Sequence, residues 1–148
     1  MKKVFCSICV LFVLIMCSCN DNTNVWKDTH KVYGDGTYQI FNHKKNGIDI
    51  KGISNSKCHQ CIIDEIRSIK EIDEFVYVYG KFTGHDVYTV IDTNNNKAKY
   101  FVICEPGDVL GMTNINELIK SGTFEFLSSY DYFNEKEKEI FNDIKESK

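Results

Sequence analysis

The chain lacks several features that would point to a familiar activity. It has one proline, Pro106, and no Gly-rich phosphate loop, because neither a helical pattern nor a Lys-Ser/Thr pair follows Gly34-Asp35-Gly36. Lysines and arginines form no stripe with interleaved aromatic residues, which argues against nucleic-acid binding. No serine nucleophile motif occurs, and the histidines are scattered: they are His30, His43, His59 and His85. We therefore expect a protein that is not an enzyme and needs no cofactor.

The chain also lacks an apolar run of the length that a transmembrane helix needs, about 20 residues. Its apolar run extends only from Val4 to Met16, after Lys2-Lys3 and before the polar tract 20–24. This order is typical of a signal peptide over residues 1–18, and it favours export over a retained span. Removing that segment takes away two lysines and no acidic residue, so the formal charge changes from −3 to −5.

The sequence Met16-Cys17-Ser18-Cys19 resembles a bacterial lipobox, in which the last cysteine becomes the lipidated N-terminus. Met16 departs from the leucine that is usual there. A diacylglycerol group and an amide-linked acyl chain such as palmitate at Cys19 would anchor the protein stably, since more than one chain is present. The resemblance implies a protein held by lipid on the cell membrane or outer membrane. An ordinary secreted chain and an uncleaved anchor are the alternatives.

Residues 19–32 then read as the lipidated cysteine and a polar tether, and 33–148 as a single folded domain. Three cysteines remain in that domain, so at most one internal disulfide forms and one thiol is left over. They are Cys58, Cys61 and Cys104.

Cys58-His59-Gln60-Cys61 is the one chemically suggestive motif in the chain, and it has three interpretations. A redox pair should open a helix inside a βαβ unit, which the surrounding pattern does not provide. A metal site would use Cys58, His59, Cys61 and Cys104, although adjacent residues bind one ion awkwardly. The third interpretation is structural, with a disulfide from Cys61 or Cys58 to Cys104, or with plain thiols.

Alternating apolar residues predict a mainly antiparallel β-sheet of about five to six strands. Residues 37–41 and 48–53 form a predicted hairpin with one wet face, with Ile48 and Ile50 on the dry one. The richest β pattern, 75–104, predicts a three-strand meander. Residues 65–72 are ambiguous, since their isoleucine spacing suits a helix and their context suits a strand.

The pattern changes after Glu105-Pro106-Gly107. Thr113 or Asn114 begins a predicted short helix that ends at Lys120, with Asn114 and Glu117 as a capping box. After a short extended piece at 124–127, residues 134–146 predict an amphipathic helix that packs on the sheet. Its apolar stripe is Ile140, Phe141 and Ile144. The fold class is therefore α+β.

The lipobox and six segments that follow it in this order resemble small bacterial lipoproteins of unknown function. The segments are Gly34–Ile40, Ile66–Ile69, Phe75–Val78, Tyr88–Asp92, Leu110–Thr113 and Asn116–Ile119. The similarity spans most of residues 33–120 and implies a strand at 65–72. It implies no catalytic residue, and it does not include the pair Cys58 and Cys61.

Four tyrosines are predicted to share one side of the sheet: Tyr77, Tyr79, Tyr88 and Tyr100. They form either a face for peptide or sugar contact or a core beneath the C-terminal helix. The leading hypothesis is an envelope lipoprotein that binds a protein partner, in an inhibitory or immunity role. The alternatives are a thiol-disulfide or metal-handling protein that uses Cys58 and Cys61, and a small-ligand binder that uses the tyrosines.

Overall fold

The computed structural model describes residues 29–104 and 115–147, without the side chains of 115–117. The predicted signal peptide 1–18, the lipidation site Cys19 and the capping box at Asn114 and Glu117 lie outside this description. Within the described residues, no helix combines the length and the apolar character that a membrane span requires.

The first half of the domain forms an antiparallel sheet, sheet A, in the order β1-β2-β3-β4. Its strands are β1 (Thr29–Tyr33), β2 (Tyr38–Lys45), β3 (Ile48–Asn55) and β4 (Gln60–Ile63). The Gly34–Gly36 segment makes the β1–β2 turn, in which both glycines adopt positive φ.

The second sheet, sheet B, has the order β5-β6-β7-β8-β9. Its strands are β5 (Glu65–Ile72), β6 (Phe75–Phe82), β7 (His85–Asp92), β8 (Lys97–Val102) and β9 (Phe124–Phe126). Strands β5 to β8 are an antiparallel meander, whereas β9 returns parallel to β8 after the short helix α2 (Ile115–Lys120).

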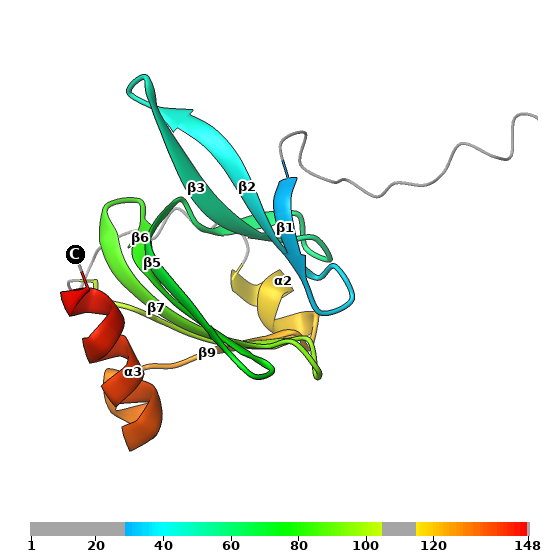
Figure 1. Cartoon of the computed structure of the whole chain (residues 1–148). Helices are drawn as coiled ribbons and strands as arrows, with labels where there is room; N and C mark the ends of the chain where they lie inside the picture. Colours follow the sequence, from blue (N-terminus) through cyan, green and yellow to red (C-terminus); the bar gives the residue numbers. More distant parts are fainter. Residues whose placement is uncertain (1–28, 105–114, 148) are drawn as a thin grey trace, which may run out of the picture.

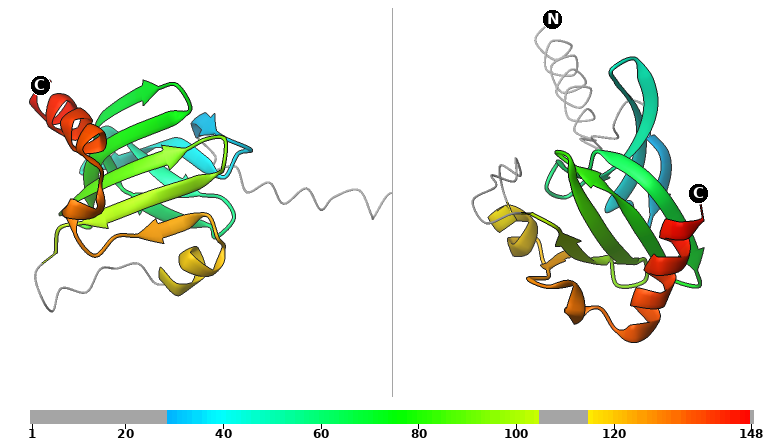
Figure 2. Two further views of the ribbon diagram at one scale, coloured as in Figure 1. Left: turned by 90° about the horizontal axis from the view of Figure 1, so that it is seen from below. Right: turned by 90° about the vertical axis from the view of Figure 1, so that its left-hand side faces the viewer.

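Sheet A and helix α3 (Glu135–Glu146) lie on opposite faces of sheet B (Figures 1 and 2). The main core fills the space between the two sheets and includes Tyr38, Ile53, Val78 and Tyr100. The second core lies between sheet B and α3, and it includes Tyr77, Tyr88 and Phe141. Strand β6 is therefore buried on both faces, as the apolar and aromatic residues on both of its faces predict.

Helix α3 begins after a 3-10 turn, η1 (Tyr130–Tyr132), and is capped by Asn134. The Asn134 side chain accepts a hydrogen bond from the Glu137 N–H at 2.9 Å, and the Glu137 carboxylate accepts one from the Asn134 N–H at 2.9 Å. This capping box satisfies two backbone donors that the helix itself leaves unbonded. The predicted apolar stripe of Ile140, Phe141 and Ile144 is buried against sheet B.

Helix α2, strand β9 and the turn between them close one end of the main core. Leu118 of α2 is fully buried in that core. The hydroxyl of Tyr38 donates to the Thr123 carbonyl, and the Asn55 amide donates to the Thr123 hydroxyl at 3.0 Å. Sheet A is thus held to the α2–β9 turn by buried polar bonds, each of which would be costly to leave unmade.

The mainly antiparallel β fold with a short helix and a packed C-terminal helix is confirmed, but the described part of the chain has nine strands in two sheets. The expected count of five to six was too low because β1 and β4 were not predicted, residues 65–72 were left ambiguous, and β9 was expected only as a short extended piece. Strand β1 lies inside the expected tether, and β4 begins within the cysteine motif. The ambiguous segment 65–72 is strand β5.

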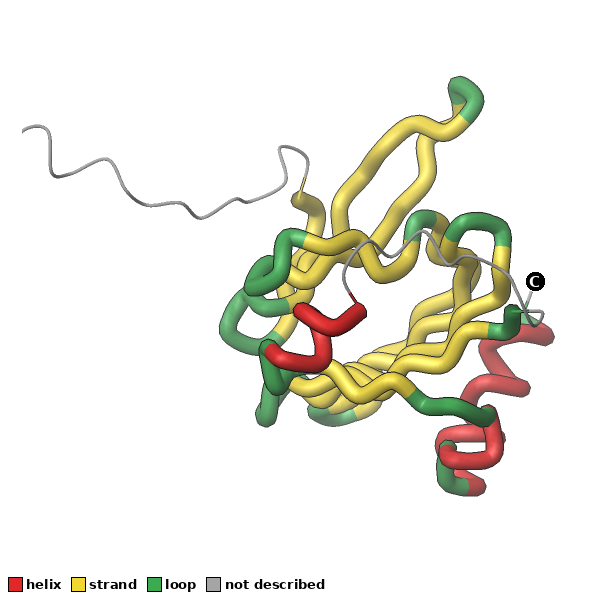
Figure 3. The backbone as a smooth tube through the Cα atoms, turned by 180° about the vertical axis from the view of Figure 1, so that it is seen from behind, coloured by secondary structure: helices red, strands yellow, loops and turns green. Residues whose placement is uncertain are grey.

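The outer half of the β2–β3 hairpin, residues 42–51, extends beyond the rest of sheet A, and we call it the arm (Figures 1 and 3). Asn46 and Gly47 form its turn with φ of 53° and 79°, which suits a two-residue hairpin loop. The predicted dry face is wrong here, because Ile48 is 67% exposed and Ile50 is only half-buried. The alternation of apolar and polar residues in β3 continues into the arm, beyond the residues that pack in the core.

Candidate functional site

Three of the four predicted face tyrosines lie together on the outer face of sheet B. Tyr79 is directly opposite Tyr88 in the β6–β7 register, and their ring centroids are 5.2 Å apart. Phe141 of α3 covers this cluster, with its ring 6.0 Å from Tyr77 and 5.3 Å from Tyr88 in edge-to-face geometry. Tyr77, Tyr79 and Tyr88 are each 4–6% exposed, so they form a core beneath the helix.

Tyr100 lies on the opposite face, in the main core, and is fully buried. The β7–β8 register places Tyr100 opposite Thr89 and Phe101 opposite Tyr88. Because neighbouring residues of a strand point to opposite faces, Phe101 and not Tyr100 joins the outer aromatic cluster. The Tyr100 hydroxyl donates to the Ile62 carbonyl at 2.7 Å, which links sheet B to sheet A.

Lys145 fixes the C-terminal turn of α3 over the same tyrosines. Its ammonium donates to the Tyr88 hydroxyl at 3.0 Å and lies 5.3 Å from the centre of the Tyr79 ring. The hydrogen bond to Tyr88 raises the pKa of Lys145, so this cation stays charged at all physiological pH values. The helix is therefore attached by packing along its length and by a cation–π contact at its end.

The cysteine motif forms the β3–β4 turn and the start of β4. His59 has a φ of 52° in that turn, and the Cys58 N–H donates to the Asn55 side chain at 3.3 Å. Cys58 and Cys61 are half-buried thiols at the edge of the main core, whereas the thiol of Cys104 is exposed beyond β8. Among the described side chains, no group of three His, Cys, Asp or Glu residues has a metal-binding arrangement.

Burial and, to a smaller extent, the nearby Asp64 carboxylate together raise the pKa of the Cys61 thiol to about 12. Its Sγ lies 3.3 Å from the Ile63 carbonyl, to which it donates. A thiol attacks a disulfide as the thiolate, so Cys61 has very little of the reactive form at neutral pH. Its environment is that of a structural cysteine.

Four buried groups make the stability of the domain sensitive to alkali. Burial raises the pKa of Cys61 and of three tyrosines, Tyr33, Tyr38 and Tyr100. In the unfolded chain these groups lose their protons above about pH 9–10, while in the folded chain they keep them. The unfolded state then binds fewer protons, so the free energy of unfolding falls as pH rises, by up to about 1.4 kcal/mol per pH unit for each group.

We therefore expect full stability up to about pH 9 and a progressive loss between about pH 9 and 12. Urea unfolding followed by circular dichroism at stepped pH measures this loss. Tyr100→Phe keeps the ring and removes one titrating group, so its slope above about pH 10 should be shallower than that of the unmodified chain. If the stability of both proteins fell equally steeply with pH, the loss of stability could not be assigned to the buried Tyr100 hydroxyl.

A cleft of about 390 Å³ lies at one end of sheet B, where β7, β8 and β9 meet the start of α3. Phe75 and Val90 line it with apolar surface, and both belong to the outer face of the sheet. The remaining lining side chains include Asp92, Lys97, Lys99, Glu125 and Glu137. The cleft thus combines an apolar surface with charged groups of both signs.

An ion pair between Lys99 and Glu137 connects the sheet to the helix at the cleft. The Lys99 Nζ donates to the Glu137 Oε1 at 2.9 Å, and the Glu137 side chain is only 8% exposed. Glu137 also closes the α3 capping box, so both of its oxygens have partners. A buried charge with this many partners fixes the start of α3 relative to β8.

This cleft is absent from the sequence predictions because it depends on long-range pairing. Lys99 is opposite Val90 on one side and beside Glu125 on the other. The alternation of Lys97 and Lys99 around Ala98 is a local signal that could have placed both lysines on one face of a strand, but the strand was expected to begin only at Lys99. The parallel placement of β9 and the position of Glu137 had no local signal.

Comparison with known proteins adds no relative at this point. No family model, no curated protein sequence and no solved structure matches the chain.

Proposed function

We propose that the chain is exported, is anchored by lipid at Cys19, and binds a polypeptide of an envelope partner in the cleft beside Glu137. The observation that supports this is the cleft itself, with its apolar surface of Phe75 and Val90 and its charged border. The proposal keeps the leading hypothesis of a non-enzymatic binding lipoprotein with an inhibitory or immunity role. It moves the binding surface from the buried tyrosines to the end of the same sheet.

A polypeptide suits the cleft because an edge strand forms one of its sides. Within the described residues β9 is the last strand of sheet B, and Phe124 and Glu125 line the cleft. An edge strand offers N–H and C=O groups to an added strand, while pockets beside it select side chains. In an extended segment that pairs with β9, every second side chain would face the apolar surface of Phe75 and Val90. Charged side chains of the same segment would lie near Lys97, Asp92 or Glu125.

A small ligand is the second candidate for the same cleft. A volume of about 390 Å³ falls in the range of small-molecule sites, about 300–1,000 Å³. An amphipathic molecule with an apolar body and a charged head would match the lining residues. A polypeptide that pairs with β9 would slow amide hydrogen exchange at Phe124–Phe126, whereas a small ligand would add no strand there. Hydrogen exchange at these residues therefore distinguishes the two ligands.

The thiol-disulfide alternative is weaker for this chain, because Cys61 is buried and its pKa is raised to about 12. The same burial leaves little of the thiolate that would bind a metal ion.

Lipidation is tested by replacing Cys19 in the full chain. We expect Cys19→Ser to abolish labelling by an alkyne-bearing palmitate and to leave a precursor that still carries residues 1–18. The matched control Cys17→Ser should be labelled and processed normally, because only the thiol of Cys19 receives the diacylglyceryl group in the proposal. Mass spectrometry of the processed N-terminus provides the measurement. The proposed anchor would be overturned if the Cys19→Ser protein were labelled. It would also be overturned if the protein with the unmodified sequence were processed and released without a label.

A further inference from the structure

The arm, residues 42–51, has a surface that the core does not explain. Ile48 is 67% exposed at its tip, next to Lys45 in the cross-strand register. The tight turn requires residues that adopt positive φ, which Asn46 and Gly47 do. It does not require an isoleucine at position 48. Ile48 therefore places one large apolar side chain, exposed and without a structural role in the turn, at the end of a projecting hairpin.

The arm carries positive charge in a chain whose net charge is negative. It contains three lysines and one aspartate, against a formal charge of −3 for the whole chain. The Lys44 Nζ is 3.9 Å from the Asp49 carboxylate, with both side chains more than 70% exposed, so this pair contributes little. Lys45 is shared between Asp64 at 3.5 Å and Glu65 at 3.6 Å, while Lys44 and Lys51 remain at the surface.

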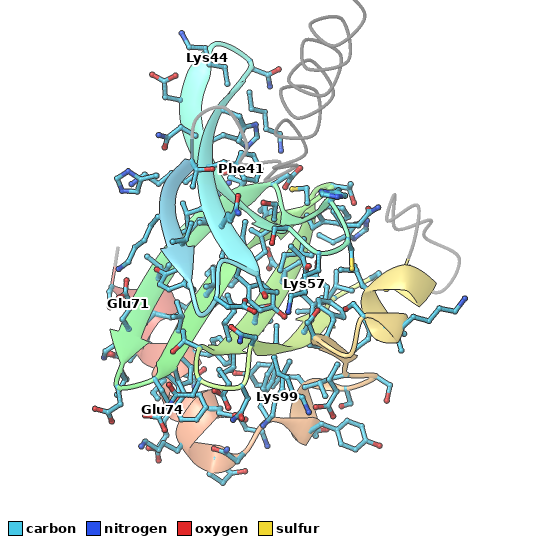
Figure 4. All side chains as sticks on the ribbon, turned by 90° about the vertical axis from the view of Figure 1, so that its right-hand side faces the viewer. Phe41, Lys44, Lys57, Glu71, Glu74 and Lys99 are labelled. Atoms are coloured by element: carbon cyan, nitrogen blue, oxygen red, sulfur yellow. The ribbon has the colours of Figure 1, made fainter. Side chains whose placement is uncertain are left out.

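The opposite end of the molecule carries an exposed acidic turn. The β5–β6 turn consists of Asp73 and Glu74, both exposed. Figure 4 shows Lys44 and Glu74 at opposite ends of the domain. A negatively charged surface would therefore attract the arm and repel the far turn, which orients the whole domain.

The direction of β1 places the start of the described chain on the side of the arm. Thr29 is paired with Phe41 at the base of the arm, and β1 then runs away from the arm to Tyr33. Ten residue steps separate Thr29 from Cys19, which span at most about 35 Å at about 3.3–3.6 Å each. The arm extends four residues beyond Phe41 to Lys45, about 13 Å at about 3.3 Å per residue. A tether of that length lets the arm tip reach the surface that holds Cys19.

We propose that the arm contacts the anionic phospholipid surface to which Cys19 is anchored, with Ile48 at the acyl boundary and Lys44 and Lys51 at the headgroups. This inference rests on the proposed lipid anchor. An apolar side chain flanked by lysines matches the interface, because lysine stems lie along apolar surface while their ammonium groups reach phosphate. The contact would turn the cleft and α3 away from the membrane, toward partners in the envelope.

Quenching of a single tryptophan by brominated lipid tests the contact. The lipidated full chain, with Trp26→Phe, is placed in vesicles of phosphatidylglycerol and phosphatidylcholine, with tryptophan introduced as Ile48→Trp or as Tyr132→Trp. Position 132 is the matched control, since Tyr132 is also 67% exposed and lies on η1 beside the start of α3. We expect quenching of Ile48→Trp to exceed that of Tyr132→Trp by at least about twofold, and to fall when Lys44→Glu and Lys51→Glu are added or when phosphatidylcholine is used alone.

The outcomes separate this inference from the anchor itself. A chain that floats with the vesicles but is quenched equally at both positions overturns the arm contact and leaves the anchor in place. A chain that carries no lipid and does not float overturns both. A tryptophan at position 48 that is protected only when envelope proteins are added assigns the arm to a protein partner and also overturns the inference.

Discussion

Phe141→Ala is expected to lower the free energy of unfolding by about 3–5 kcal/mol, which is the usual range for removing a fully buried phenylalanine. Phe141 is 0% exposed at the centre of the contact between α3 and sheet B. Its ring packs against Tyr88 at 5.3 Å and Phe133 at 5.0 Å, both in edge-to-face geometry. Its removal leaves a cavity between a rigid sheet and a helix that is capped at Asn134, so the site collapses only in part.

Urea denaturation of the full chain measures this change, with Tyr132→Ala as the control. Tyr132 lies at the surface of η1, and its truncation should change the stability by no more than about 0.5 kcal/mol. The Phe141→Ala protein should also show faster hydrogen exchange in α3 than in β6. A loss below about 1 kcal/mol would mean that α3 is not an integral part of the fold.

Gly80→Val is expected to destabilise the domain by about 3 kcal/mol, at the upper end for an overpacked core. A Cβ atom at position 80 would lie 2.5 Å from the Glu65 carbonyl oxygen and 2.8 Å from Cγ2 of Ile63. The nearer atom belongs to the backbone of β5, which is paired with β6 and cannot move alone. Gly80 therefore lets β6 lie close to the chain at the point where β4 of sheet A passes into β5 of sheet B, because a larger residue would clash there.

Thermal unfolding of Gly80→Ala, Gly80→Val and Lys81→Val tests this explanation. The control at Lys81 places the same β-branched side chain on the next residue of β6, which is half-buried. We expect the order Lys81→Val, Gly80→Ala, Gly80→Val in increasing loss of stability. A Gly80→Val protein as stable as the Lys81→Val protein would show that the space at Gly80 is not required.

The strands of sheet B between Phe75 and Asp92 were predictable because their signal is local. β-branched and aromatic residues fill both faces of β6 and β7, and short polar turns separate them. The helix at 134–146 was predictable for the same reason, from the spacing of Ile140, Phe141 and Ile144.

Residues 65–72 were ambiguous because irregular pairing in and just before this segment distorts the alternation of apolar residues. The β3–β4 register shifts between Ile53 and Ser54, and the β5–β6 register shifts between Ile66 and Ser68. Each irregularity changes which face the next residues occupy, so two short strands imitate helical spacing. The resemblance to small lipoproteins implied the correct strand at 65–72, where periodicity alone left both options.

The placement of the four tyrosines and the cleft required long-range register. Tyr100 was assigned to the face of Tyr88, whereas pairing with Thr89 turns it inward. The cleft needs β9 to return parallel to β8 and Glu137 to reach Lys99, across 38 residues of sequence. Neither the parallel pairing of β9 with β8 nor the contact between Glu137 and Lys99 produces a periodic pattern in the sequence.

Site-specific photo-crosslinking in the native envelope tests the cleft most directly. A photoreactive amino acid replaces Lys97, which is exposed and lines the cleft, or Lys136, which is also exposed, on α3, and is not among the residues that line it. We predict one discrete polypeptide adduct from position 97, no adduct from position 136, and loss of the position 97 adduct when Phe75→Ala or Glu125→Lys is added. Equal adducts from both positions, or an adduct at position 97 that is indifferent to Phe75 and Glu125, would contradict the assignment of the cleft as the binding surface.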